Sequence, residues 1–309
     1  MRQGFFSRHT DLWEFGYKLN FPGTALPHRL RAGSFKSQCI VEDPIAPMFE
    51  NLFDAPLIII GPAIIAALCL FGIGGLLLVR RFVLPRLRIH DEDSHFSGAI
   101  VHSVMVFYGL AVALIAVSVF ETYAEVLKVV SNEATTLAAL YRDVSSYPDP
   151  IRLQLTNELS GYTEYVIHEA WPLQRRGQVP AGGVERINRF QAILISFEPA
   201  KESQKLLHSE TLRAYNAVIV ARRMRLDAVG TRLPNVMWIV IIFGAVISLV
   251  TCFFFKVEDV RLHGILVSLL AMFIGLVIFM ILALDRPFRG ELGIGPEPYE
   301  LIHNQLMKP

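Results

Sequence analysis

The chain has 309 residues, of which 53% are hydrophobic and 18% charged, and this charge content is low for a soluble protein of its length. The formal net charge of +1 supplies no basic field that would gather nucleic acid, so no nucleic-acid partner is expected. The cysteines Cys39, Cys69 and Cys252 lie far apart and predict neither a disulfide framework nor a zinc site, and no cofactor is expected.

The first segment, residues 1–47, differs from the rest because its Arg, His, Phe and Pro residues follow no period. We expect it to be a poorly ordered N-terminal leader. It lacks the uninterrupted apolar core of an ordinary signal peptide. Because a coherent pattern begins only at Met48, we hypothesise that the leader reflects an overextended start codon.

Four apolar runs, each longer than 20 residues, contain no Asp, Glu, Lys or Arg. They cover residues 55–79, 97–120, 233–255 and 262–284. A bilayer core about 30 Å thick is crossed by about 20 such residues in a helix. The runs therefore predict four transmembrane helices, since helices on a soluble core of this length normally carry a charged outer face.

The four runs are expected to pair as two hairpins, residues 48–120 and 233–284. With an even number of crossings, the N-terminus, residues 121–232 and the tail 285–309 share one side, and both short loops share the other. The two loops hold six Lys and Arg residues, which favours a cytoplasmic location for them. Arginines just before the third run favour the opposite orientation, so the orientation stays open.

Residues 121–232 are predicted to form a helical extramembrane domain. Its first helix continues out of the second span, because a seam of apolar residues follows the three-and-four spacing of a heptad. This seam comprises Phe120, Tyr123, Leu127, Val130, Ala134, Leu137, Tyr141 and Val144. Further helices are expected from Asp149-Pro150 to Trp171-Pro172, from Val184, and from Lys201 to Arg232. An inward stripe is predicted at Leu127, Leu137, Tyr141, Leu155, Tyr162, Phe190, Leu194 and Phe197. The fold class is thus an all-α integral membrane protein with a domain inserted between spans two and three.

No catalytic motif is present, and we expect no enzymatic activity. His168-Glu169 lacks the second histidine of a zinc-protease motif. Gly72, Gly74 and Gly75 lie within a span and predict close helix packing rather than dinucleotide binding. The His90–His95 loop is the densest set of possible metal or proton ligands, but a solvated turn is the favoured interpretation of it.

Seven residues are candidates for a pore or its rim. They are His102, Ser103, Phe107, Ser118, Glu121, Arg232 and Asp285. His102 lies inside a span, where an ionisable group is costly, but a neutral histidine bonded to a neighbouring helix is the favoured explanation of it. Glu121, Arg232 and Asp285 fall at span ends, where they form either a charged ring at a pore entrance or an interfacial ion-pair belt.

Several segments resemble the bacterial bestrophin-like membrane protein family over about residues 57–300. The matching segments are Leu78-Val79-Arg80-Arg81, Phe107-Tyr108-Gly109-Leu110, Glu133-Ala134 with Leu140-Tyr141-Arg142, Glu169-Ala170-Trp171-Pro172, and Leu284-Asp285-Arg286-Pro287-Phe288-Arg289-Gly290. The resemblance implies four membrane helices with a helical extramembrane domain. Through the bestrophins it further implies a homo-oligomeric anion channel lined by the second helix, although their own constriction residues have no match in this chain.

The expected function is therefore a homo-oligomeric ion channel, selective for anions, with the second span lining the pore. The alternative is a non-conducting membrane scaffold or regulatory protein whose helical domain binds a partner. The expected location is the bacterial plasma membrane, crossed several times, with lipid, further copies of the chain and inorganic ions as partners.

Overall fold

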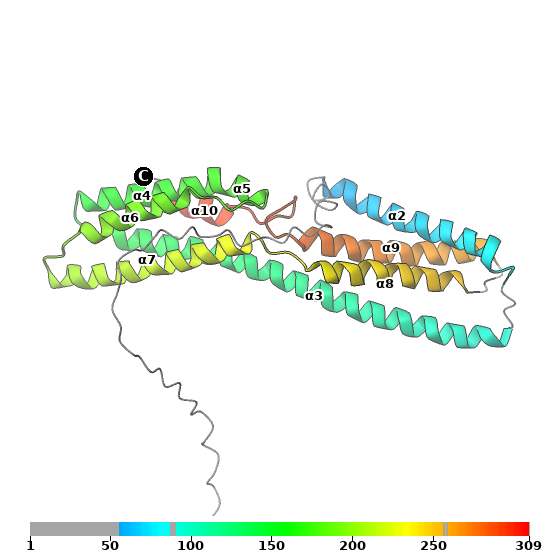
Figure 1. Ribbon diagram of the computed structural model, residues 1–309. Coiled ribbons are helices and arrows are strands. Elements are labelled where there is room, and N and C mark those ends of the chain that lie inside the picture. The colour runs from blue at the N-terminus through cyan, green and yellow to red at the C-terminus, as the bar shows by residue number, and fades with distance from the viewer. Residues whose placement is uncertain (1–55, 87–90, 256, 258, 309) are drawn as a thin grey trace, which may run out of the picture. The chain divides into compact units, whose positions relative to one another are not determined.

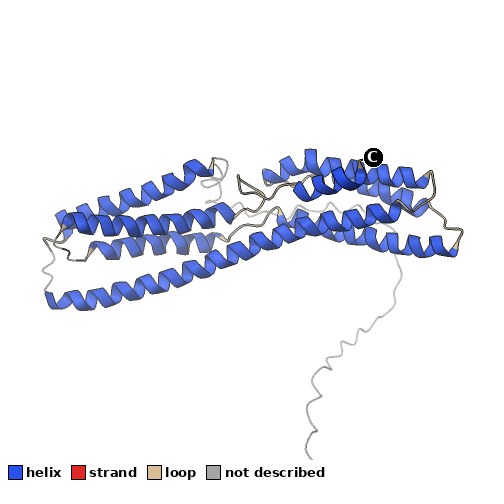
Figure 2. Ribbon diagram, turned by 180° about the vertical axis from the view of Figure 1, so that it is seen from behind, coloured by secondary structure: helices blue, strands red, loops and turns tan. Residues whose placement is uncertain are grey.

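Helices make up all the regular structure in the described part of the chain, and no strand occurs there (Figure 2). This structure, a computed structural model, describes residues 56–86, 91–255, 257 and 259–308, with the side chains of 91–97, 99 and 100 left out. All of these residues belong to one compact unit, residues 44–309. The leader, residue 90 and the side chains of residues 91–95 lie outside the described residues, while the backbone of residues 91–95 is helical and not the predicted loop.

Four helices are long and apolar enough to cross a membrane, as predicted. They are α2 (Leu57–Leu78), α3 (Asp91–Val144), α8 (Asn235–Phe253) and α9 (Val260–Leu284). A π-helical turn, Val79–Val83, continues α2 beyond its apolar run and carries Arg80 and Arg81. At 1.5 Å per residue the 54-residue α3 is about 80 Å long, so it extends well past a bilayer core.

The first group of helices comprises α2, α8, α9 and the N-terminal half of α3 as far as Phe120, and we call it the apolar bundle. Glycines bring α2 close to its neighbours: a Cβ on Gly75 would lie 2.5 Å from the Phe253 ring, and one on Gly72 would lie 3.1 Å from Val267. Close packing therefore explains these two glycines. Gly74 has nothing within 4 Å of such a Cβ, so the packing role does not extend to it.

The second group comprises α3 from Glu121 to Val144 and the helices that pack with it, and we call it the polar bundle. Its other members are α4 (Ile151–Tyr165), α5 (Trp171–Arg175), α6 (Gly183–Ser196), α7 (Glu202–Ala228) and α10 (Glu297–Ile302). α7 and α10 contact α3, and α6 contacts α4 (Figure 1). The tail thus packs with residues 121–232, which agrees with their predicted placement on one side.

Two predicted boundaries are wrong. The helix that begins at Ile151 does not end at Trp171-Pro172, because a π-helical turn, Val166–Ala170, leads straight into α5. Pro172 lies in the first turn of α5, where its missing N–H costs no hydrogen bond. α7 ends at Ala228 rather than Arg232, and Pro234 is the N-cap of α8.

The inward side of α3 also differs from the prediction at its start. Phe120 and Leu127 were expected in the seam, but they are 60% and 47% exposed. The buried positions follow a seven-residue repeat instead: Val112, Val119, Val126, Glu133 and Leu140, with Val130, Leu137 and Val144 beside them. The other members of the predicted inward stripe are buried or pack against the buried core of the polar bundle, which confirms its packing.

Candidate functional site

One face of α3 is uncovered over most of the length of the helix. Twelve residues spaced by three and four are all exposed, and we call them the α3 stripe: Ser103, Phe107, Leu110, Leu114, Val117, Glu121, Glu125, Lys128, Asn132, Thr135, Ala139 and Arg142. At 3.6 residues per turn they fall within an arc of about 100°. The stripe holds three predicted site residues, Ser103, Phe107 and Glu121.

The chemistry of the α3 stripe changes at Glu121. Before that residue it is apolar except for Ser103, with Phe107 73% and Leu114 64% exposed. After it the stripe is polar or charged apart from one alanine. The span of α3 is also the least covered of the four, with 11% of its most apolar window buried against 39% for α9. Lipid or another copy of the chain must therefore cover the apolar part.

A pocket at the junction of the two bundles brings three other predicted residues together. Ser118, Arg232 and Asp285 line this cavity of about 150 Å³, which we call the junction pocket. Its remaining lining residues are Val119, Thr122, Thr231, Leu233, Pro234, Met237 and Leu284. The pocket thus lies between α3, the α7–α8 connection and the end of α9. Glu121 is next to Thr122 in the chain but does not line the junction pocket.

Asp285 has a defined structural task in this junction. Its Oδ1 accepts a hydrogen bond of 2.6 Å from the Leu233 backbone N–H, which fixes the end of α9 to the start of α8. Burial raises the pKa of Asp285 above its ordinary value, while the Leu233 amide and then Arg286 act in the opposite direction. Of the two alternatives predicted for Asp285, the interfacial belt that fixes helix ends therefore describes it better than the charged ring at a pore entrance.

The segment after Asp285 ties the two bundles together. Three hydrogen bonds hold it: Tyr123 Oη to the Leu292 carbonyl (3.0 Å), Arg289 Nη2 to the Arg176 carbonyl (2.6 Å) and Trp171 Nε1 to the Ile294 carbonyl (3.1 Å). Phe288 and Tyr299 from this segment pack on the Trp171 ring. Segments far apart in sequence, Glu169–Pro172 and Leu284–Gly290, therefore meet in one place.

A buried ion pair lies at the centre of the polar bundle. Arg225 Nε donates to Glu133 Oε2 at 2.6 Å, and its Nη2 donates to Oε1 at 3.2 Å. The Tyr162 hydroxyl donates to the same Oε1 at 2.8 Å. The Trp171 and Tyr299 rings cover the guanidinium, with centroids 5.8 and 5.7 Å from its Cζ. Burial alone lowers the pKa of Arg225, but Glu133 and the tyrosines raise this pKa overall, so the guanidinium stays charged.

Arg225 was not predicted to be a structural residue. It was considered only as one of several arginines before the third span. The sequence position of its partner, Glu133, indicated such a residue. Glu133 belongs to the same seven-residue repeat as the buried Val119 and Val126, where an unpaired carboxylate would be very costly. A charge on a buried seam predicts a buried countercharge.

The histidine candidates do not form a site in the described residues. His102 is exposed and lies about 100° round α3 from Ser103, off the α3 stripe. His263 is buried, and its Nε2 lies 3.1 Å from the Cys252 carbonyl. Among the described side chains no three His, Cys, Asp or Glu residues are grouped as they would be around a metal ion.

The described helices define an all-helical membrane protein. The sequence pattern of the Bestrophin-like domain matches residues 66–299, which is most of the chain, and the chain belongs to the bestrophin-like family. This agrees with the resemblance that the motifs indicated. Comparisons with curated proteins and with solved structures give no significant match.

Proposed function

We propose that the protein is a homo-oligomeric ion channel, without enzymatic activity, in which the apolar part of the α3 stripe lines the pore. The observation that carries this proposal is the continuity of the stripe. One helix presents an uncovered apolar face, and the same face becomes polar from Glu121 onward. Around an axis between copies it would supply an apolar neck and a charged entrance.

The other spans are less suited to line a pore. α9 is the most covered, and it packs against α2, α3 and α8. Among the described residues, the span of α3 is buried along one narrow side, which faces α8 and α9, and there the Tyr108 hydroxyl donates to the Ile241 carbonyl at 3.1 Å. Its opposite side carries Phe107 and Leu114, which match the rings of apolar side chains that gate channels by dewetting.

The charge at the entrance sets the expected selectivity. Family resemblance favours anions, whereas the Glu121 and Glu125 carboxylates would favour cations at that end of the pore. We propose that the channel conducts anions and that the carboxylates of this acidic rim reduce the anion flux. Replacing Glu121 with Gln should then raise chloride flux relative to sodium flux. Glu198→Gln, an exposed change in the loop before α7, is the matched control.

Cysteine accessibility tests the pore lining directly. In a cysteine-free background, reconstituted Leu114→Cys protein should react with a membrane-impermeant thiol reagent and lose ion flux. Ile58→Cys, on the 80% exposed outer side of α2, should be inert because it faces lipid. Reaction at neither position, together with no flux from a folded oligomer, would favour the non-conducting scaffold.

The proposal places the protein in a bacterial plasma membrane, which the chain crosses four times. The polar bundle would then lie in water on one side of the bilayer, with the turn between α8 and α9 on the other. Labelling of single cysteines at Ser203 and at Ser94, near the start of α3, tests this arrangement. Labelling of both from one side of sealed vesicles would contradict it.

A further inference from the structure

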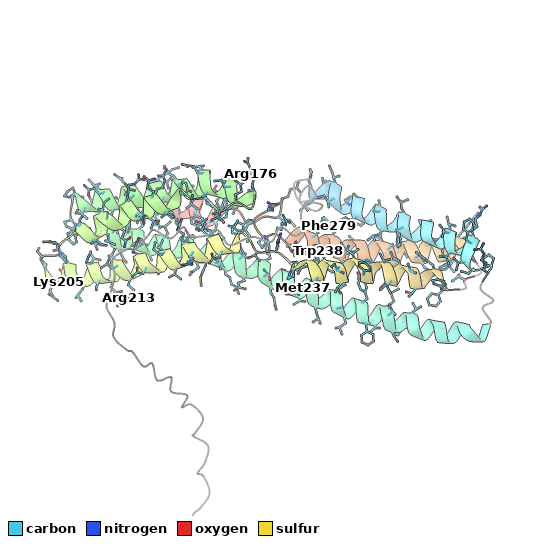
Figure 3. All side chains as sticks on the ribbon, in the orientation of Figure 1. Arg176, Lys205, Arg213, Met237, Trp238 and Phe279 are labelled. Carbon is cyan, nitrogen blue, oxygen red and sulfur yellow. The ribbon has the colours of Figure 1, made fainter. Side chains whose placement is uncertain are left out.

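The junction pocket lies where apolar surface gives way to polar surface. α8 begins after Pro234 and α9 ends at Leu284, so the pocket marks the end of both apolar helices. Figure 3 shows Met237 and Trp238 at this end of α8, beside α3. In a bilayer this level corresponds to the lipid headgroups.

The lining of the pocket has two chemically different parts. Val119, Met237 and Leu284 offer an apolar wall toward the spans. Arg232 supplies a guanidinium, and Ser118 and Thr231 supply hydroxyls, whereas the Thr122 hydroxyl already donates to the Ser118 carbonyl at 2.9 Å. A guanidinium with nearby hydroxyls is a typical donor set for phosphate oxygens. An apolar wall that continues from such a set fits the glycerol and upper acyl region of a lipid.

The size and charge of the pocket agree with such a ligand. Its volume of about 150 Å³ is several times the roughly 30 Å³ occupied by one water molecule, so a phosphate group can enter. Asp285 adds a negative charge, but its Oδ1 is engaged by the Leu233 amide and the side chain is only 6% exposed. Two arginines, Arg232 in the lining and Arg286 outside it, act on this one carboxylate.

We propose that the junction pocket binds the phosphate group of an anionic phospholipid, with Arg232 as its main cationic contact. The lipid would occupy the joint between α7 and α8 and the end of α9. It would thereby stabilise the connection between the two bundles. This assignment goes beyond the proposed channel function and does not require conduction.

Lipid binding to delipidated full-length protein in detergent tests the assignment by native mass spectrometry. The probe is dioleoyl phosphatidylglycerol, and dioleoylglycerol is the tail-matched lipid without phosphate. Arg232→Gln should weaken phosphatidylglycerol binding by about tenfold or more, since a hydrogen bond to a charged group contributes about 1.5–3 kcal/mol. Dioleoylglycerol binding should not change.

Three further variants separate the effects of the charge, the Ser118 hydroxyl and the position of the charge. Arg232→Lys should recover most of the binding because it keeps the charge, and Ser118→Ala should show a smaller loss. Arg213→Gln removes the same charge near the middle of α7, away from the pocket, and should bind like the parent protein (Figure 3). The size-exclusion profile of each variant checks its fold.

Two results would overturn the proposal. One is an equal loss of phosphatidylglycerol binding in Arg232→Gln and Arg213→Gln, which would indicate a non-specific charge effect. The other is full displacement of the lipid by millimolar inorganic phosphate, which would assign the pocket to free phosphate. Ion flux plays no part in either readout, so a failure here is distinct from a failure of the channel proposal.

Discussion

The two halves of α3 are buried to very different extents. In the polar bundle the helix packs against α7, and Val130, Leu137 and Leu140 are fully buried. In the apolar bundle, among the side chains of α3 that the structure describes, only Val112 and Val119, on one narrow side, are buried. The same helix is therefore a core element in one bundle and a peripheral one in the other. A helix that is anchored in one bundle and uncovered in the next is suited to join copies of the chain.

The comparison also shows where sequence periodicity carries information. In water an exposed position is polar, so the alternation of apolar and polar residues identifies the buried side. In lipid an exposed position is apolar as well, and the two sides look alike. This is why the predicted seam is right at Leu137 and wrong at Phe120, whereas the exposed Leu127 lies in the polar bundle and has no such explanation.

The largest expected effect is at Leu137, which has no exposed surface. Leu137→Asp would bury an unpaired carboxylate and should destabilise the protein by about 4 kcal/mol or more, enough to abolish expression. Leu127→Asp makes the same change on the exposed side of the same helix and should express normally. Yield and thermal melting in detergent compare the two. Equal loss in both variants would contradict the packing of α3 on α7.

The next largest effect concerns the Glu133–Arg225 pair. Arg225→Met leaves the Glu133 carboxylate buried without its partner and should cost about 3–5 kcal/mol. The double variant Glu133→Leu with Arg225→Met removes both charges and should recover a large part of that loss. Arg213→Met breaks an exposed pair with Glu210 and should change the melting temperature little. If the double variant were no more stable than Arg225→Met, the unpaired Glu133 carboxylate would not be the cause of the loss in Arg225→Met.

A smaller effect is expected from the ionisation of Asp285. Its pKa is raised in the folded protein, chiefly by burial, so the folded state holds its proton more tightly than the unfolded state. The stability from this residue is present below the unfolded pKa and is lost as the pH rises through the folded pKa. Asp285→Asn should flatten the melting-temperature profile over that acidic range, while its amide oxygen still accepts from Leu233. An unchanged profile would exclude Asp285 as the titrating group.

The sequence predicted most of the fold and part of the site. The four spans, the continuation of α3 and the helices after Pro150 and Pro199 follow from local composition and from proline chemistry. The junction pocket does not, because it depends on how α3 and the α7–α8 connection meet in space. Arg232 and Asp285 were singled out as span-end residues and Ser118 as a pore candidate, and only the structure shows that they share one cavity.

The smallest effect on stability, and the most informative for function, is expected on the uncovered face of α3. Leu114→Asn places an amide on the α3 stripe, where the side chain is 64% exposed and leaves no cavity behind. If this face lines a pore, water solvates the amide, the apolar neck hydrates more easily, and ion flux should rise with little change in melting temperature. Leu70→Asn makes the same change on α2, where Leu70 is 72% exposed, and should leave flux unaltered. Flux measured in liposomes for both variants separates a pore-lining face from a lipid-facing one. If Leu114→Asn and Leu70→Asn lowered expression equally and both left flux unchanged, the α3 stripe would face lipid. The first half of α3 would then be peripheral in the assembled protein, as it is in the single chain.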